Sequence, residues 1–140
     1  MNQGYYDKPV KCRKKVSANI CLSLEEAYTH FTVPELFKEW YGIFGCWIRK
    51  EFENGFNFSY IQDYSAQIVF ISKMKNEIKL TQRIENIAFP PADILISFQD
   101  FNKKTKVNIE INAHMPLYWF EVFDDWDAID EIGNNFTHQN

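Results

Sequence analysis

Residues 16–42 read VSANICLSLEEAYTHFTVPELFKEWYG, and this stretch decides the fold. Apolar and polar residues alternate from Val16 to Leu22, which is the two-residue period of a β-strand. Ser23, with a glutamate three residues later, forms a capping box that predicts the start of a helix. Pro34 fits the first turn of a second helix, because the N–H that proline lacks would have no helical partner there. The sequence therefore predicts one strand followed by two short helices.

Beyond this stretch, apolar residues recur at every second position, which predicts an antiparallel sheet. The expected strands cover residues 46–52, 56–60, 68–74, 78–84, 94–98 and 107–113. Asn54-Gly55 predicts a tight hairpin, because these residues tolerate the positive φ that such turns need. Asn102-Lys103-Lys104 predicts another turn, and Pro90-Pro91 interrupts pairing because proline has no N–H to donate.

The last segment returns to a helical period. Trp119, Phe123, Trp126, Ile129 and Ile132 follow one another at steps of three and four, which gives one apolar stripe over roughly four turns of helix. A sheet with one apolar face needs a cover, and this helix is the candidate. We expect an α+β fold in one domain over residues 12–133, with a flexible leader at 1–11 and a frayed tail at 134–140.

Three segments resemble the activator of heat-shock protein 90 ATPase homologue family, within the START-like, Bet v 1-like superfamily (SRPBCC). Residues 16–28 resemble its first strand and following helix, residues 33–41 (VPELFKEWY) its T-x-P-E-x-L-x-x-W-F segment, and residues 105–111 (TKVNIEI) its final strand. The resemblance implies a helix-grip fold: six to seven antiparallel strands curved around a long C-terminal helix, with an apolar cavity between them. Members of the superfamily bind lipids, sterols, polyketides or other hydrophobic ligands; some are enzymes and some assist chaperones.

Composition argues against several classes of function. The net charge of -4 is unlike the basic excess of a nucleic-acid-binding chain. The three cysteines lack C-x-x-C spacing, so neither a disulfide framework nor a zinc site is expected. His30, His114 and His138 are scattered, so we expect no metal or other cofactor, although His114 ends a strand near the expected cavity mouth. No apolar run is long enough to span a membrane, and we expect a cytoplasmic protein.

The expected cavity would be lined by inward residues of the strands and by the aromatic face of the last helix. The candidate ligand-binding residues are Phe58, Tyr60, Phe70, Leu80, Gln82, Ile96, Phe98, Ile109, Trp119, Phe123 and Trp126. Polar residues also lie in phase with the apolar stripes: Gln82, Ser72 and Lys50. A polar group in a dry interior needs a partner. These groups therefore either form hydrogen bonds within the core or orient a ligand.

The aromatic content of 17% and the expected topology favour non-catalytic binding of a hydrophobic small molecule or lipid. The alternative is a chaperone helper or another protein-interaction module with a filled core. The resemblance suggests it, as do a basic segment at residues 8–15 and an acidic one at residues 121–131. A third possibility is a cyclase- or hydrolase-like enzyme using the same cavity, although the sequence shows no nucleophile motif and no convergent acid–base pair.

Overall fold

The computed structural model describes residues 8–41, 46–60, 65–85 and 87–132, with Cys46 and Tyr60 described by their backbone alone. Its strands are β1 (Val10–Ile20), β2 (Cys46–Phe52), β3 (Gly55–Tyr60), β4 (Ser65–Met74), β5 (Glu77–Ile84), β6 (Ala92–Phe101) and β7 (Lys104–Met115). Its helices are α2 (Leu24–Thr32), α3 (Pro34–Tyr41), α4 (Leu117–Phe120) and the 3-10 helix η2 (Glu121–Glu131). Most of the expected leader and all of the expected tail fall outside these ranges.

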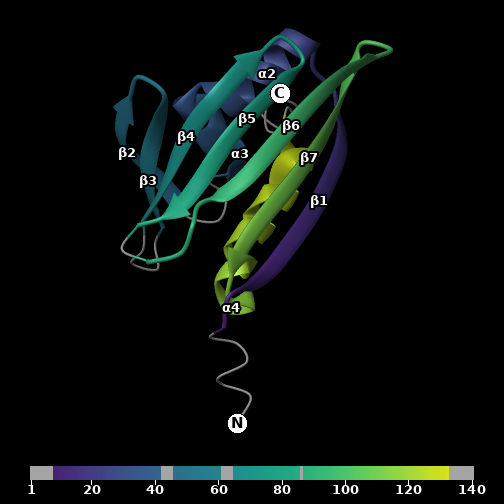
Figure 1. The fold of residues 1–140 in the computed structure, drawn as a ribbon. Helices are drawn as coiled ribbons and strands as arrows, with labels where there is room; N and C mark the ends of the chain where they lie inside the picture. The colour runs from purple at the N-terminus through teal and green to yellow at the C-terminus, as the bar shows by residue number, and fades with distance from the viewer. Residues whose placement is uncertain (1–7, 42–45, 61–64, 86, 133–140) are drawn as a thin grey trace.

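Within the described ranges, the strands form one seven-stranded antiparallel sheet in the order β1-β7-β6-β5-β4-β3-β2. Strands β2 to β7 follow one another as neighbours, and β7 then pairs with β1 from Val10 to Ile20. The helices lie on one face of this curved sheet, with the C-terminal helix close to β1 and β7 (Figure 1). This is the expected α+β helix-grip arrangement.

Strand β1 begins at Val10, earlier than the predicted start at Val16. The added part alternates in burial, with Cys12 buried and Lys14 half-buried between exposed basic residues. Lys14 occupies a position of this strand that faces inward. The two-residue period of residues 10–15 is therefore not visible as an alternation of apolar and polar residues in the sequence. The basic segment is therefore part of the sheet.

The two short helices form as predicted. The Ser23 hydroxyl oxygen accepts a hydrogen bond from the backbone N–H of Glu26 at 3.2 Å, which confirms the helix cap. Pro34 is the first residue of α3. The indole Nε1 of Trp40 donates to the carbonyl oxygen of His30 at 2.9 Å and ties α3 to α2.

Register shifts in β2 and β4 change the face on which two of the in-phase polar residues lie. After the shift in β2, Lys50 pairs with Asn57, and after the shift in β4, Ser72 pairs with the exposed Lys79. Paired residues share a face of the sheet, so Lys50 and Ser72 turn away from the apolar interior. Gln82 keeps the inward position and is fully buried.

The predicted hairpin at Gly55 is present, but the structure requires a glycine there for a different reason from the predicted one. A Cβ on Gly55 would overlap the carbonyl oxygen of Ile68 in β4, so glycine is needed for the close approach of the two strands. Among the described non-glycine residues, positive φ angles occur at Asn102 (49°) and Lys103 (68°). These two residues form the turn from β6 to β7. Positive φ angles in such a turn match the twist of the two strands of a hairpin.

The C-terminal helix lies where the sequence places it, but it is mostly a 3-10 helix instead of the expected α-helix. A 3-10 helix has three residues per turn, so residues three apart lie on one line. The buried line consists of Phe123, Trp126 and Ile129, and the exposed line consists of Glu121, Asp124, Asp127 and Asp130. The sequence repeats both residue types at intervals of three, which fits this tighter helix.

Candidate binding site at the mouth of the helix grip

The structure brings the described members of the predicted lining set together between the sheet and the helices. Seven of them are at most 2% exposed: Phe58, Leu80, Gln82, Ile96, Ile109, Phe123 and Trp126. Phe70 and Phe98 retain more exposure, at 8% and 5%, and Trp119 is half-buried. The side chain of Tyr60 lies outside the described residues.

The part of this interior next to α3 is filled by aromatic rings. The centroid of Phe37 lies 5.1 Å from that of Phe56 and 5.9 Å from that of Trp126. Trp40 and Trp126 are 5.5 Å apart, and Tyr41 and Phe58 are 5.3 Å apart. Edge-to-face contacts at these separations are favourable, and the side chains themselves occupy this space.

Gln82 joins this ring cluster by hydrogen bonds. Its Oε1 accepts from the indole Nε1 of Trp126 at 2.9 Å, and its Nε2 donates to the hydroxyl of Tyr41 at 3.3 Å. All three side chains are 0% exposed. Of the two readings left open by the sequence, a hydrogen bond within the core is the one that the structure shows for Gln82.

A hollow of about 560 Å³ opens at the other end of the interior, between α2 and the turn from β4 to β5. We call it the mouth hollow; it is lined by Leu24, Glu25, Tyr28, Thr29, Lys73, Met74 and Lys75. The ring centroid of Tyr28 lies 5.7 Å from that of Phe98, and Nζ of Lys73 lies 5.2 Å from the ring centroid of Phe70. The two more exposed phenylalanines of the lining set thus lie next to the walls of the mouth hollow.

Local sequence explains how these walls form. Leu24 and Tyr28 are four residues apart on α2 and so lie on the same side of that helix. The register shift in β4 places Lys73 opposite the buried Ile78, and Met74 at the strand end is 62% exposed. Burial raises the pKa of the Tyr28 hydroxyl above the ordinary value of a tyrosine, which is already uncharged at neutral pH.

Sequence reasoning missed the residues of the mouth hollow. Leu24 and Tyr28 fall in the helix predicted after Ser23, and Met74 ends the strand predicted over residues 68–74; neither pattern marks a binding surface. The available signal was an apolar residue between two lysines, directly before a turn, in Lys73-Met74-Lys75. Exposed methionine is frequent at adaptable binding surfaces.

The histidines do not gather at this site. His114 was expected near the cavity mouth, but it is exposed on the outer face of the sheet, opposite Lys11 in the register. It lines a separate hollow there with Pro90, because its position in β7 alternates with the inward residues. His30 is buried in α2 with its Nδ1 2.8 Å from a carbonyl oxygen of the same helix, and His138 lies outside the described residues.

Two other kinds of feature are absent from the described residues. No group of three or more His, Cys, Asp or Glu side chains in that part of the chain is arranged to hold a metal ion. None of the helices in the described ranges combines the length and the apolar character needed to cross a bilayer.

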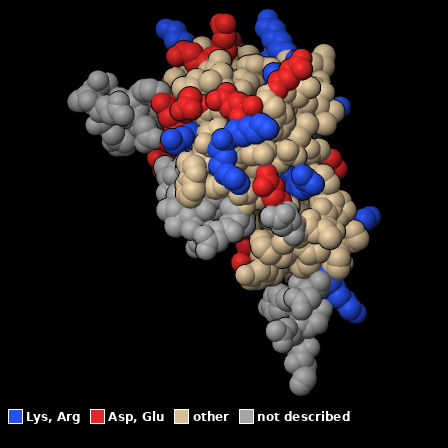
Figure 2. Space-filling view, turned by 90° about the vertical axis from the view of Figure 1, so that its left-hand side faces the viewer, with Lys and Arg blue, Asp and Glu red and all other residues tan. Residues whose placement is uncertain are grey.

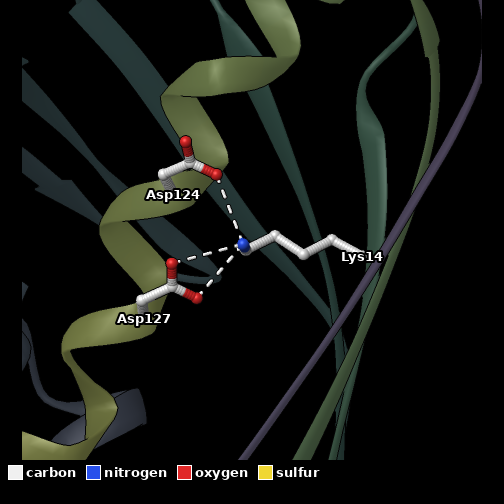
Figure 3. A network of polar contacts seen from close by, with 3 residues as sticks. All are labelled: Lys14, Asp124 and Asp127. Atoms are coloured by element: carbon white, nitrogen blue, oxygen red, sulfur yellow. Dashed lines mark hydrogen bonds and ion pairs between the residues drawn. The ribbon is translucent and has the colours of Figure 1, made fainter.

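The basic and acidic segments of the sequence meet in the structure. Nζ of Lys14 in β1 lies 3.2 Å from a carboxylate oxygen of Asp124 and 3.1 Å from one of Asp127, both in η2 (Figure 3). Burial would lower the pKa of Lys14, but the hydrogen bonds and charges of these carboxylates outweigh it and raise the pKa. On the side of the molecule shown in Figure 2, cationic and anionic side chains are interspersed. The basic and acidic segments, which lie far apart in the sequence, therefore neutralise each other in part within the fold.

Asp125 lies on the same helix between these two carboxylates in sequence. Burial, with a further contribution from the charges of Asp124 and Asp127, raises the pKa of Asp125 to about 6. The C-terminal helix thus carries a carboxyl group that gains a proton at mildly acidic pH.

No protein-family model matches the chain, and no curated protein matches it. Solved structures match nearly all of it. A START superfamily protein from Mycobacterium smegmatis has 13% identity and a TM-score of 0.62, covering 90% of this chain and 98% of its own. An HSP90 activator from Plasmodium falciparum has 12% identity and a TM-score of 0.65, with coverage of 89% and 96%.

The Bet v 1 allergen Ara h 8.0201 has 6% identity and a TM-score of 0.65, and the match covers 94% of this chain and 100% of the allergen. Likeness at these identities concerns the fold, because one fold carries many functions. The strand order, the position of the helices and these matches agree: the chain has the helix-grip fold of the START-like, Bet v 1-like superfamily.

Proposed function

We propose that this protein binds an apolar small molecule or lipid in the mouth hollow, without transforming it. The observation that carries the proposal is the hollow of about 560 Å³, whose walls contact Phe70 and Phe98 of the predicted lining set. Ligand sites of proteins have volumes of about 300–1,000 Å³ and combine apolar walls with a few polar groups. Leu24, Tyr28 and Met74 supply the apolar walls here.

The packed ring cluster supports the choice of the mouth hollow over the interior next to α3. Gln82, Tyr41 and Trp126 hydrogen-bond to one another, and opening a space there would leave buried polar groups without partners. The mouth hollow needs no such rearrangement. Affinity comes from the apolar area that ligand and hollow remove from water, at ~25 cal/mol per Å² before the costs of association.

Titration with N-phenyl-1-naphthylamine, an uncharged fluorophore that brightens in apolar surroundings, tests the proposal. Met74→Glu places a charge in the mouth hollow and should weaken binding about fivefold or more. Ile71→Glu is the matched control, because Ile71 lies on the same strand and is 64% exposed against 62% for Met74. Thermal unfolding followed by circular dichroism shows that both variants fold. Equal effects of the two substitutions, or no binding by the wild type, would refute the proposal.

A protein-interaction role with a filled core is the second candidate function. The ring cluster around Phe37 and Trp40 favours it, since the protein's own side chains occupy that part of the interior. The pairing of Lys14 with two carboxylates weighs against the charge argument for it, because these groups are engaged within the chain. A wild-type protein that binds no apolar fluorophore but captures a partner from lysate in a salt-sensitive manner would favour this second function.

A further inference from the structure

We infer that the ligand of the mouth hollow is a single-chain amphiphile with an anionic head, which Lys73 and Lys75 hold at the rim while its apolar chain lies against Tyr28 and Met74. This inference rests on the proposed function and names the class of its ligand. Among the described residues, two lysines and one carboxylate, Glu25, are the charged side chains that line the hollow. Cationic groups are therefore in excess where a ligand head would meet water.

The lysines differ in how the fold places them. The register shift between Phe70 and Ser72 sets Lys73 opposite the buried Ile78, on the inward side of the sheet. Its ammonium lies 5.2 Å from the ring centroid of Phe70, a cation–π separation that holds the charge over the apolar floor. Lys75 is exposed in the turn that follows. Both lysines are exposed, and the Lys73 ammonium is the one that lies over an aromatic ring of the interior.

The apolar walls continue inward from these amines. Tyr28 is half-buried and contacts the ring of Phe98 at a centroid distance of 5.7 Å. Its hydroxyl, like that of any tyrosine at neutral pH, can donate a hydrogen bond without adding negative charge. A ligand whose head lies at the lysines and whose apolar tail follows Tyr28 toward Phe98 keeps the head in water and the tail against aromatic rings. A ligand with charge at one end fits this geometry better than a neutral, compact one.

Displacement of N-phenyl-1-naphthylamine by dodecanoate and by 1-dodecanol separates the head from the tail. The wild type should bind dodecanoate about three- to tenfold more tightly than 1-dodecanol at pH 7.5, because two exposed ion pairs contribute modestly. The double variant Lys73→Gln/Lys75→Gln should lose this preference while its affinity for 1-dodecanol is unchanged. Lys73→Arg/Lys75→Arg should retain the preference, and 0.5 M salt should reduce it.

Lys79→Gln/Lys106→Gln is the matched control, since it removes the same charge from exposed lysines outside the mouth hollow. It should leave both affinities unchanged. Equal binding of dodecanoate and 1-dodecanol by the wild type would overturn the anionic head and leave the proposed function standing. Failure of both probes to displace the fluorophore would overturn the ligand class at this site. Absence of fluorophore binding in the wild type would instead refute the proposed function itself.

Discussion

Replacement of Gln82 by leucine tests whether the interior is a satisfied core. Gln82 is 0% exposed and accepts the hydrogen bond of the Trp126 indole N–H at 2.9 Å. Leucine has a similar size but cannot accept that bond, so the buried N–H would lose its partner at a cost of ~1–3 kcal/mol. The apolar surface that leucine buries offsets part of this cost. We expect a net loss of ~1–2 kcal/mol in the free energy of unfolding.

Urea unfolding followed by far-ultraviolet circular dichroism measures this loss. With a slope of about 2 kcal/mol per M, the midpoint should fall by roughly 0.5–1 M. Gln67→Leu is the control, because Gln67 is partly exposed and its contact with Arg83 is long, at 3.5 Å; its midpoint should move little.

A double-mutant cycle with Trp126→Phe isolates the hydrogen bond itself. Phenylalanine removes the N–H that Gln82 accepts. In that background Gln82→Leu should therefore cost at least ~0.5 kcal/mol less than in the wild type. An unchanged midpoint for Gln82→Leu, or strictly additive losses in the cycle, would refute the reasoning.

Three further substitutions test local features of the fold. Between about pH 4 and pH 6 the folded protein binds more protons at Asp125 than the unfolded chain does, because the pKa is raised to about 6 from 3.8. The stability contributed by this group is therefore present at low pH and lost as the pH rises through 6. Asp125→Asn should stabilise the protein by ~1 kcal/mol at pH 8, after allowance for solvent screening. At pH 4 it should change the stability little. Gly55→Ala should lower the melting temperature by about 5 °C or more, because the new Cβ overlaps a carbonyl oxygen of β4. Lys103→Gly should stabilise by ~0.5 kcal/mol, because φ is 68° there.

The controls for these substitutions follow from the same structure. Glu121→Gln removes an exposed carboxylate of the same helix and should not reproduce the pH dependence of Asp125→Asn. Lys104→Gly, at the first residue of β7, should bring no stabilisation. A pH-independent effect at Asp125, a wild-type melting temperature for Gly55→Ala, or a loss of stability for Lys103→Gly would each contradict the corresponding argument.

Local patterns were sufficient for the order of elements. The cap at Ser23, the start at Pro34 and the two-residue periods of the strands depend on neighbours along the chain, and the structure confirms them. Register shifts depend on pairing between strands, so Lys50 and Ser72 were placed on the wrong face. Apolar steps of three and four are the spacing of an α-helix, so the 3-10 helix was not expected; the run of three-residue steps from Phe123 to Ile132 is the part of the pattern that fits the tighter helix.

The mouth hollow could not be found from the sequence for a related reason. Its walls come from α2 and from the turn after β4, which the fold brings together across the open end of the sheet. Neither segment has a binding motif of its own, and Met74 resembles the end of an ordinary strand. The lining set was predicted from inward phase alone, which does not distinguish a packed core from a ligand wall.

Mapping of chemical shifts by nuclear magnetic resonance during titration with 1-dodecanol tests the central claim most directly. This uncharged probe does not depend on the nature of the ligand head. The account predicts that the largest changes occur at Leu24, Tyr28 and Met74, extend to Phe70 and Phe98, and leave the indole N–H of Trp126 in place. Largest changes at Gln82 and Trp126, with the mouth hollow unaffected, would contradict it.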